Sequence, residues 1–409
     1  MAYDLLKGLR VVEGASFIAA PSCGLHLLQM GAEVIRFDPI GGGPDFHRWP
    51  LSPGGMSLYW EGLNKGKKSI ALDLGRPEGR ELAQRLAAAP GEAGGVFVTN
   101  YPVEGFLSHA RLAALRSDLI SLRVMGWADG RTAVDYTVNA ALGVPLMTGP
   151  AELPADQPVN HVLPAWDLMT GAYAAFVLMA AERCRRETRA GQEIRLPLAD
   201  VALASLSHIG QVAEVLVGGA DRPRYGNDLF GAFGRDFALA DGERVMVAAI
   251  TRRQWTGLLE ALGLQEAVAA LERDAGTSFA ADEGERFRHR ERLTPLVAAA
   301  MQARTLAQLA PLFETLGVCW APYRTTLEAL NDPAIVPPDT PLMATIDHPS
   351  GHTYPTAGPA ASLEGLARDI PVAAPKLGQH TEEVLAEVLG LPAGEIARLH
   401  DAKLVASAA

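Results

Sequence analysis

The sequence predicts an α/β protein with a large Rossmann-like domain, in which helices cover a parallel sheet, and a smaller α+β domain. Three observations carry this prediction. Short apolar strands alternate with helical segments over the first two hundred residues. The segments 9–13, 23–30 and 33–38 form a strand-helix-strand unit, which favours parallel pairing. After residue 217 the pattern changes to a Gly- and Arg-rich stretch, a hairpin and a run of helices.

The remaining elements follow in order along the chain. Further strands are expected at 68–74, 95–101, 119–125 and 191–198. Helices are expected at 77–89, 111–115, 165–183 and 199–217. Next come a hairpin at 237–247, helices at 252–263, 283–301 and 306–316, short strands from 318, and closing helices at 381–389 and 393–402. We expect the large domain over 1–217 and 321–409, a linker over 218–234, and the small domain over 235–320.

Composition excludes several classes of function. The 409 residues carry a formal net charge of −11, which argues against nonspecific nucleic-acid binding. Cys23, Cys184 and Cys319 lie far apart, so neither a zinc site nor a disulfide framework is expected. We see no signal-peptide core and no apolar stretch of 18 residues. A cytoplasmic protein without a membrane contact is therefore expected.

The glycines at 41–43 follow the second strand rather than the first, and no helix opens after them. This arrangement is not the dinucleotide-binding fingerprint, so a nicotinamide site is not predicted. In open parallel sheets, ligands bind beyond the carboxyl ends of the strands. That rule predicts one ligand site formed by the segments 17–21, 38–45, 72–73 and 100–102.

One carboxylate stands at the start of the helix expected from about residue 165. Pro164 disfavours helical geometry at Leu163, which places Asp167 in the first helical turn. Exposed N–H groups at that end attract an anion. Asp167 is therefore either a helix-capping acid or a catalytic carboxylate, and the helix pattern alone leaves both interpretations open.

Several motifs in order resemble the family III CoA transferases (CaiB/BaiF type), a group that includes formyl-CoA transferase and α-methylacyl-CoA racemase. The matching segments are 6–12, 32–38, 64–74, Asn100-Tyr101, Asp135 with Gly143, Asp167 with Gly171, Ala321-Pro322 and Asp332-Pro333. The resemblance implies an interlocked homodimer in which CoA lies at the strand ends and the partner's small domain covers the site. It also implies that Asp167 is a nucleophile that accepts the acyl group and then CoA. No metal or other cofactor is implied, because CoA is part of the substrate.

The segments 133–140 and 159–167 most resemble the branch of this family that moves CoA between the C1 and C4 carboxyls of mesaconyl-CoA (2-methylfumaryl-CoA). In that reaction the acceptor is the second carboxylate of the substrate itself. A free carboxylate needs a cation or several hydrogen-bond donors. The candidates are His47, Arg48 and His161, and for each an ordinary surface or loop role is the alternative.

The resemblance assigns further positions less firmly. Asp135 and Asn139 are expected at polar substrate positions near the nucleophile. The residues expected to contact CoA are Phe17, Ile18 and Ala19 at the thioester and pantetheine, Leu72 and Asp73 at the adenine through backbone groups, Asn100 and Tyr101 in the groove, and Arg36 (or Lys67) at a phosphate. The familiar glutamine is replaced here by Ile18, so that contact is altered.

The sequence also bears on three other functions. A racemase of this family carries a proton on a His at the position of Val134, and valine cannot do so. Intermolecular transfer of CoA to a separate carboxylic acid is not excluded by any residue. A CoA-binding protein without catalysis would follow if Asp167 only capped its helix.

Overall fold

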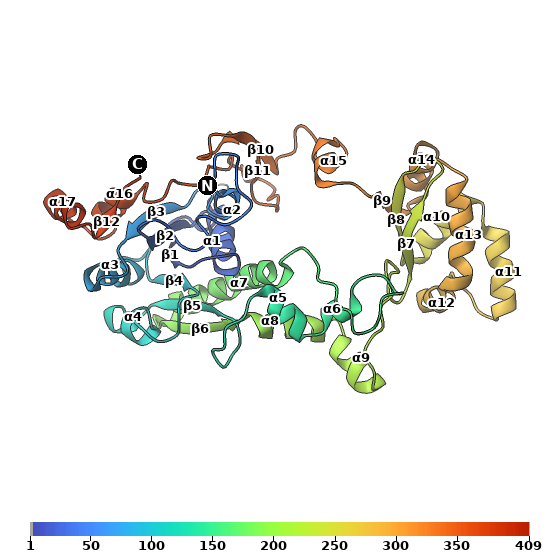
Figure 1. Ribbon diagram of the computed structural model, residues 1–409, viewed down its shortest axis with the longest axis horizontal. Coiled ribbons are helices and arrows are strands. Elements are labelled where there is room, and N and C mark those ends of the chain that lie inside the picture. Colours follow the sequence, from blue (N-terminus) through green and yellow to red (C-terminus); the bar gives the residue numbers. More distant parts are fainter. Residues whose placement is uncertain (1–2, 409) are drawn as a thin grey trace. The chain divides into compact units, whose positions relative to one another are not determined.

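The structure is a computed structural model that describes residues 3–408 as two compact units (Figure 1). Unit 1 comprises residues 3–142, 162–217 and 340–408. Unit 2 comprises residues 143–161 and 218–339. Each unit is therefore assembled from segments that are distant in the sequence.

Unit 1 is built on a seven-stranded sheet with the strand order β12-β3-β2-β1-β4-β5-β6. Its strands are β1 (Arg10–Gly14), β2 (Glu33–Pro39), β3 (Lys68–Leu72), β4 (Val96–Thr99), β5 (Ile120–Met125), β6 (Gln192–Pro197) and β12 (Val405–Ala406). All neighbours pair in parallel except β12, which is antiparallel to β3. The order 3-2-1-4-5-6 is that of the Rossmann fold, in which ligands bind where β1 and β4 diverge.

Helices bury both faces of this sheet (Figure 1). One face is covered by α1 (Ala19–Gln29) and α7 (Ala165–Thr188), whose side chains share a core with Val11, Val34 and Leu122. The other face is covered by α3 (Pro77–Ala87), α4 (His109–Leu115), α16 (Thr381–Glu387) and α17 (Ala393–Asp401). The remaining helices of unit 1 are α2 (Leu58–Leu63), α5 (Asp135–Ala141), α8 (Leu198–His208) and α9 (Gln211–Gly218).

Helices α1 and α7 approach each other closely because a glycine lies at their contact. A Cβ atom on Gly171 would stand 1.9 Å from Ser22 Oγ and 2.7 Å from the Ala19 carbonyl oxygen. Ala174 and Leu178 continue the contact along the same face of α7. This packing fixes the first turns of α7, where Asp167 lies.

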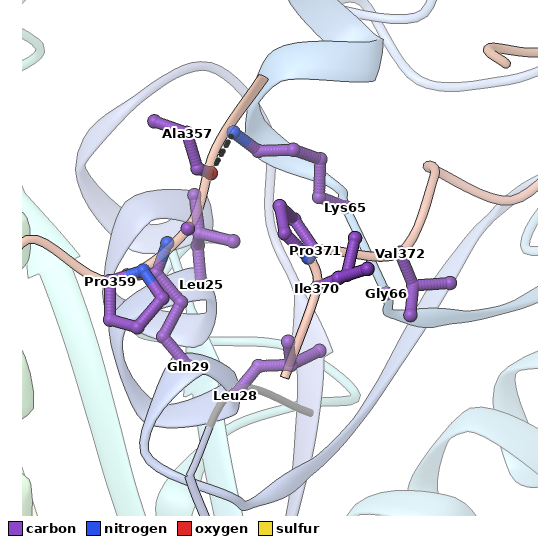
Figure 2. A pocket seen from close by; sticks show the side chains of 11 residues that line it. Leu25, Leu28, Gln29, Lys65, Gly66, Ala357, Pro359, Ile370, Pro371 and Val372 are labelled. Carbon is purple, nitrogen blue, oxygen red and sulfur yellow. Dashed lines mark hydrogen bonds between the residues drawn. The ribbon is translucent and has the colours of Figure 1, made fainter. Parts of the chain in front are cut away.

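The segment after residue 340 returns to α1 and α2. Its hairpin, β10 (Met343–Asp347) and β11 (Thr353–Ala357), is held by Glu61, which accepts from the Ser350 N–H at 2.6 Å and from Tyr354 Oη at 2.7 Å. Lys65 Nζ donates to the Ala357 carbonyl at 2.9 Å (Figure 2). The cavity beside Lys65 measures about 50 Å³, so it has room for very few water molecules and none for a substrate.

Unit 2 contains an antiparallel sheet with the order β7-β8-β9, formed by β7 (Phe233–Ala238), β8 (Arg244–Ala249) and β9 (Cys319–Pro322). Its core combines sheet residues such as Val247 with Trp255, Val297 and Phe313 from the helices. The helices of unit 2 are α6 (Val144–Met147), α10 (Arg252–Leu262), α11 (Gln265–Ala275), α12 (Glu283–Arg288), α13 (Arg290–Gln302), α14 (Leu306–Leu316) and α15 (Thr326–Asn331).

The unit boundaries differ from the predicted domain boundaries. Residues 218–234 are not only a linker, because the buried Arg224 donates to the carbonyl oxygens of Thr148 at 2.8 Å and of Pro154. These bonds join residues 218–234 to residues 143–161, which the sequence-based prediction places in the large domain. Residues 321–339 also belong to unit 2, since β9 pairs with β8.

Several helices also differ from their predicted bounds. Helix α1 starts at Ala19, because Pro21 is tolerated in a first turn. The single helix expected over 199–217 is divided into α8 and α9 at Gly210, whose φ is +82°. The helix expected over 283–301 is divided at His289, and α11 was not predicted.

In residues 3–408 no individual helix has both the length and the hydropathy that crossing a membrane requires. Helices α8 and α9 meet that criterion only when counted together, and they are bent by 69° at their junction.

The contact at Gly171 generates a stability prediction. Gly171→Ala is expected to destabilise the protein by about 2 kcal/mol, because the new Cβ must displace Ser22 and the α1 backbone. Urea unfolding measures the change. The matched control is Gly394→Ala in α17, where a Cβ meets no atom within 4 Å and stability is expected to stay level or rise by up to about 1 kcal/mol. Equal effects of the two substitutions would contradict the close packing of α1 on α7.

Candidate active site

The candidate site is centred on the first turn of α7, where Asp167 lies as predicted. The residue before this helix is Pro164, which offers no side-chain hydrogen bond to the helix. The acceptor comes instead from α5. Asp135 Oδ2 accepts from the backbone N–H of Trp166 at 2.7 Å and from that of Asp167 at 3.1 Å. Asp135 therefore caps α7 from a neighbouring helix.

A second contact fixes the same turn. Asn139, one turn after Asp135 on α5, accepts from Trp166 Nε1 at 3.0 Å. Asp135 is 2% exposed and Asn139 is fully buried. Both side chains are thus engaged with the first turn of α7, and a direct contact with substrate stays a prediction. Asp135 holds the backbone of this turn, and Asn139 holds the Trp166 side chain.

The carboxylate of Asp167 is poorly solvated. Burial, and then the negative charge of Asp135, raise its pKa to about 6, while Arg48 acts in the opposite direction. Near neutral pH the group is still mostly ionised. Partial loss of hydration makes a carboxylate more reactive towards an acyl carbon than it is in water. Asp167 therefore has the chemical state that a nucleophile requires.

Arg48 and Tyr59 lie near enough to Asp167 to interact with it electrostatically. The Arg48 guanidinium is 5.4 Å from the ring centroid of Phe17 and 5.5 Å from that of Tyr59. Ser57, the N-cap of α2, donates to the Arg48 carbonyl oxygen at 2.6 Å and so ties the Arg48 backbone to the start of α2. Arg48 is exposed and can reach an anionic ligand. His47 beside it is also exposed.

Tyr59 is a site residue that the sequence analysis missed. Its hydroxyl oxygen is enclosed and meets no hydrogen-bond partner among residues 3–408. Burial raises the pKa of the phenol above its ordinary value, with the Asp167 charge as a further cause and Arg48 opposing both, so the hydroxyl remains a donor. The only sequence signal was its place after Ser57 at the start of a helix, which says nothing of the proximity to Asp167.

The loop from Ser16 to Ile18 lies at the carboxyl ends of β1 and β4. The Ser16 N–H donates to Asn100 Oδ1 at 3.2 Å, and Asn100 Nδ2 donates to the Ser16 carbonyl at 2.9 Å. Phe17 has a φ of +70°, a conformation that costs a non-glycine residue energy, and its N–H donates to Asp45 Oδ2 at 3.2 Å. Two hydrogen-bonded neighbours, Asn100 and Asp45, thus hold the strained loop at the sheet edge where ligands bind in this type of fold.

Below this loop lies a buried cluster of charges. The Arg36 guanidinium contacts Asp38 Oδ1 and Asp45 Oδ1, each at 2.9 Å, and Lys67 Nζ contacts both Glu13 oxygens at 2.9 Å. Arg36 is 1% exposed, and its donors are taken by these carboxylates and by Asn64. A contact of Arg36 or Lys67 with a CoA phosphate stays a prediction, although the chain already provides both cations with carboxylate partners. Both cations compensate buried acids.

The other predicted contacts are spread over the same sheet edge. Ile18 is the N-cap of α1, and Ala19 behind it is buried. The Leu72 carbonyl accepts from Ile40 N–H and the Asp73 N–H donates to Leu404, so these backbone groups already serve the fold. Tyr101 is partly buried and stacks on Phe37, with ring centroids 6.5 Å apart. His161 belongs to unit 2, whereas Asp167 belongs to unit 1.

Comparison with known proteins identifies the family to which this chain belongs. A family model described as CoA-transferase family III matches residues 6–381. The chain belongs to CoA-transferase family III. The family resemblance inferred from the sequence motifs is confirmed.

The relatives of this family III protein differ in what their names say they act on. It is 49% identical over 404 residues, 98% of both chains, to 2-methylfumaryl-CoA isomerase from Chloroflexus aurantiacus. It is 28% identical to human succinyl-CoA:glutarate CoA-transferase, over 94% of this chain and 86% of that one. The crystal structure of a CAIB/BAIF family protein from Brucella suis matches with a TM-score of 0.75 and 25% identity, over 95% of this chain and 100% of that one.

No three His, Cys, Asp or Glu side chains between residues 3 and 408 are grouped as ligands of a metal ion would be. The candidate site of this family III protein combines the charged side chains of Asp167, Asp135 and Arg48 with the buried cluster around Arg36.

The buried charges predict a large effect of one substitution. Arg36→Met leaves Asp38 and Asp45 buried without their cation and is expected to cost about 3–5 kcal/mol of stability. Chemical denaturation measures the loss. Arg10→Met is the control, because the Arg10–Glu33 pair is about a quarter exposed and is worth less than about 1 kcal/mol. A loss at Arg36 as small as at Arg10 would show that Arg36 does not hold the cluster.

Proposed function

We propose that this protein is a 2-methylfumaryl-CoA isomerase, which moves CoA between the C1 and C4 carboxyls of the mesaconyl group. The observation that carries the proposal is the 49% identity, over 98% of both chains, to an enzyme of that name. The geometry of the site supports it. A half-buried carboxylate, Asp167, stands at a helix N-terminus with an exposed cation, Arg48, beside it.

The first half of the reaction uses Asp167 as the nucleophile. Its carboxylate attacks the C1 thioester carbonyl, the carbon–sulfur bond breaks, and CoA leaves as a thiolate. The product is a mixed anhydride between Asp167 and the mesaconyl group. The thiolate then attacks the aspartyl carbonyl, which frees the C1 carboxylate and leaves an aspartyl-CoA thioester.

The second half repeats these steps with the other end of the substrate. The free mesaconate turns within the site, and its C4 carboxylate attacks the aspartyl thioester. The CoA thiolate leaves again and attacks the new anhydride at the C4 acyl carbon. This last step yields mesaconyl-C4-CoA and restores the Asp167 carboxylate. Charge and atoms balance without a metal ion or a redox cofactor.

Retention of the dicarboxylate between the two halves requires a binding site for its free carboxylate. Arg48 supplies a cation, and the Tyr59 hydroxyl supplies a donor that meets no partner within the described chain, residues 3–408. His47 and His161 remain further candidates. CoA is proposed to lie along the carboxyl ends of β1, β3 and β4, beside the segments 17–19, 72–73 and 100–101.

We further propose that the protein functions as the interlocked homodimer that the resemblance implies. Unit 1 exposes several large apolar side chains before and along α7, α8 and α9, and exposed apolar side chains that gather on one surface are typical of an interface with another protein. Those most exposed are Val162 (92%), Val217 (89%), Leu216 (77%), Ile209 (71%) and Phe176 (66%). A second copy of the chain is the proposed partner of this surface.

Labelled substrate distinguishes isomerisation from ordinary transfer. The protein is incubated with mesaconyl-C1-CoA and labelled free mesaconate, and the CoA esters are analysed by mass spectrometry. We expect conversion to the C4 ester without label in the product, because the same mesaconate stays bound. Label in the CoA ester would establish an intermolecular transferase, the activity named for several relatives that are 27–29% identical. Absence of any conversion would reject both.

Substitution of the nucleophile tests the covalent mechanism. Asp167→Asn is expected to lower turnover at least 10³-fold, because an amide cannot form the anhydride. CoA binding, measured by calorimetry, and the thermal unfolding midpoint should change little. Hydroxylamine should trap an aspartyl adduct in the wild-type protein and none in the variant. A loss of less than tenfold would remove Asp167 from the mechanism.

A further inference from the structure

The cap of α7 is more costly than capping alone requires. A helix start needs an oxygen to accept its free N–H groups, and Ser, Thr or Asn provides one without charge. Here the acceptor is a carboxylate that is 2% exposed. Its second oxygen, Asp135 Oδ1, meets no donor within residues 3–408. A buried carboxylate without a paired cation is unfavourable unless another benefit offsets it.

The position of this charge suggests the benefit. Asp135 Oδ2 contacts the backbone N–H of Asp167 itself, so two carboxylates stand at the same helix end. Asn139 holds Trp166 at 3.0 Å, so the turn that joins them has little freedom to move them apart. The repulsion between the two acids is therefore retained in the folded protein.

We propose that Asp135 is a positioning residue of the transferase reaction, which holds the Asp167 backbone through two hydrogen bonds and disfavours the free Asp167 carboxylate through its charge. The inference rests on the proposed role of Asp167 as nucleophile. When Asp167 is acylated, its charge passes to the departing thiolate and the repulsion ends. The following exchanges between anhydride and thioester leave Asp167 uncharged, and the repulsion returns only in the last step, which restores the carboxylate.

The other groups around Asp167 limit this effect but do not cancel it. Arg48, from the loop after β2, favours the ionised form, and Tyr59 on α2 is a neutral phenol. On the side of α1, the uncharged Ser22 packs against α7 at Gly171. From α8, Ser205 contacts Met169. Burial and Asp135 together outweigh Arg48, and the pKa of Asp167 rises to about 6.

Asp135→Asn separates the charge from the cap. The amide oxygen can still accept from the Trp166 and Asp167 N–H groups, but the negative charge is gone. In the wild-type protein, kcat/KM should fall tenfold per pH unit below about pH 6, because protonated Asp167 cannot attack. In Asp135→Asn the pKa of Asp167 should drop, which moves this fall to lower pH by about one unit. At pH 8 kcat should decrease about tenfold or more, since the carboxylate is better stabilised.

Two controls make the result specific. Asp200→Asn removes an exposed acid from the first turn of α8 and should leave the pH profile unchanged. Asp135→Ala removes cap and charge together and should also lower the thermal unfolding midpoint relative to Asp135→Asn. If Asp135→Asn lowers kcat while the acid limb stays near pH 6, Asp135 is only structural and the inference is wrong. If Asp167→Asn remains active, the proposed function fails instead, whatever Asp135 does.

Discussion

The site depends on one pair of hydrogen bonds between helices that are thirty residues apart in the sequence. Pro164 starts α7 but offers its first N–H groups no side-chain acceptor, and the carboxylate of Asp135 supplies one from α5. The same contact sets where Asp167 lies and how its charge is treated. Capping, which usually concerns only helix stability, here acts on the reactivity of a side chain.

The surrounding fold gives this turn a rigid base. Helix α7 rests on α1 through Gly171, and α1 begins directly after the loop that contains the strained Phe17. That loop is held by Asn100 from the end of β4 and by Asp45 from the segment after β2. Asp45 in turn belongs to the buried cluster around Arg36. The backbone of the Phe17 loop, where β1 and β4 diverge, is thus connected through Asp45 to the buried ion pairs of Arg36.

The sequence predicted those features of the fold and the site that depend on local residue patterns. Strand and helix alternation indicated the parallel sheet, and Pro164 placed Asp167 in a first helical turn. The family motifs identified the transferase family. The sequence did not reveal that Asp135, Asn139 and Arg36 are buried and bonded to neighbouring parts of the chain, because burial depends on contacts between distant segments. It also missed Tyr59, because the electrostatic interaction between Tyr59 and Asp167 joins residues more than a hundred positions apart.

The strand β12 has a consequence for how the chain folds during synthesis. Unit 1 is completed by residues 340–408, since Val405 and Ala406 pair with the outer edge of β3. Unit 2 has all its segments once residue 339 has been made. On the ribosome, the unit encoded in the middle of the chain can therefore fold before the one that holds Asp167. The β3 edge stays open until Val405 and Ala406 emerge, and an open edge is where unwanted strand pairing begins.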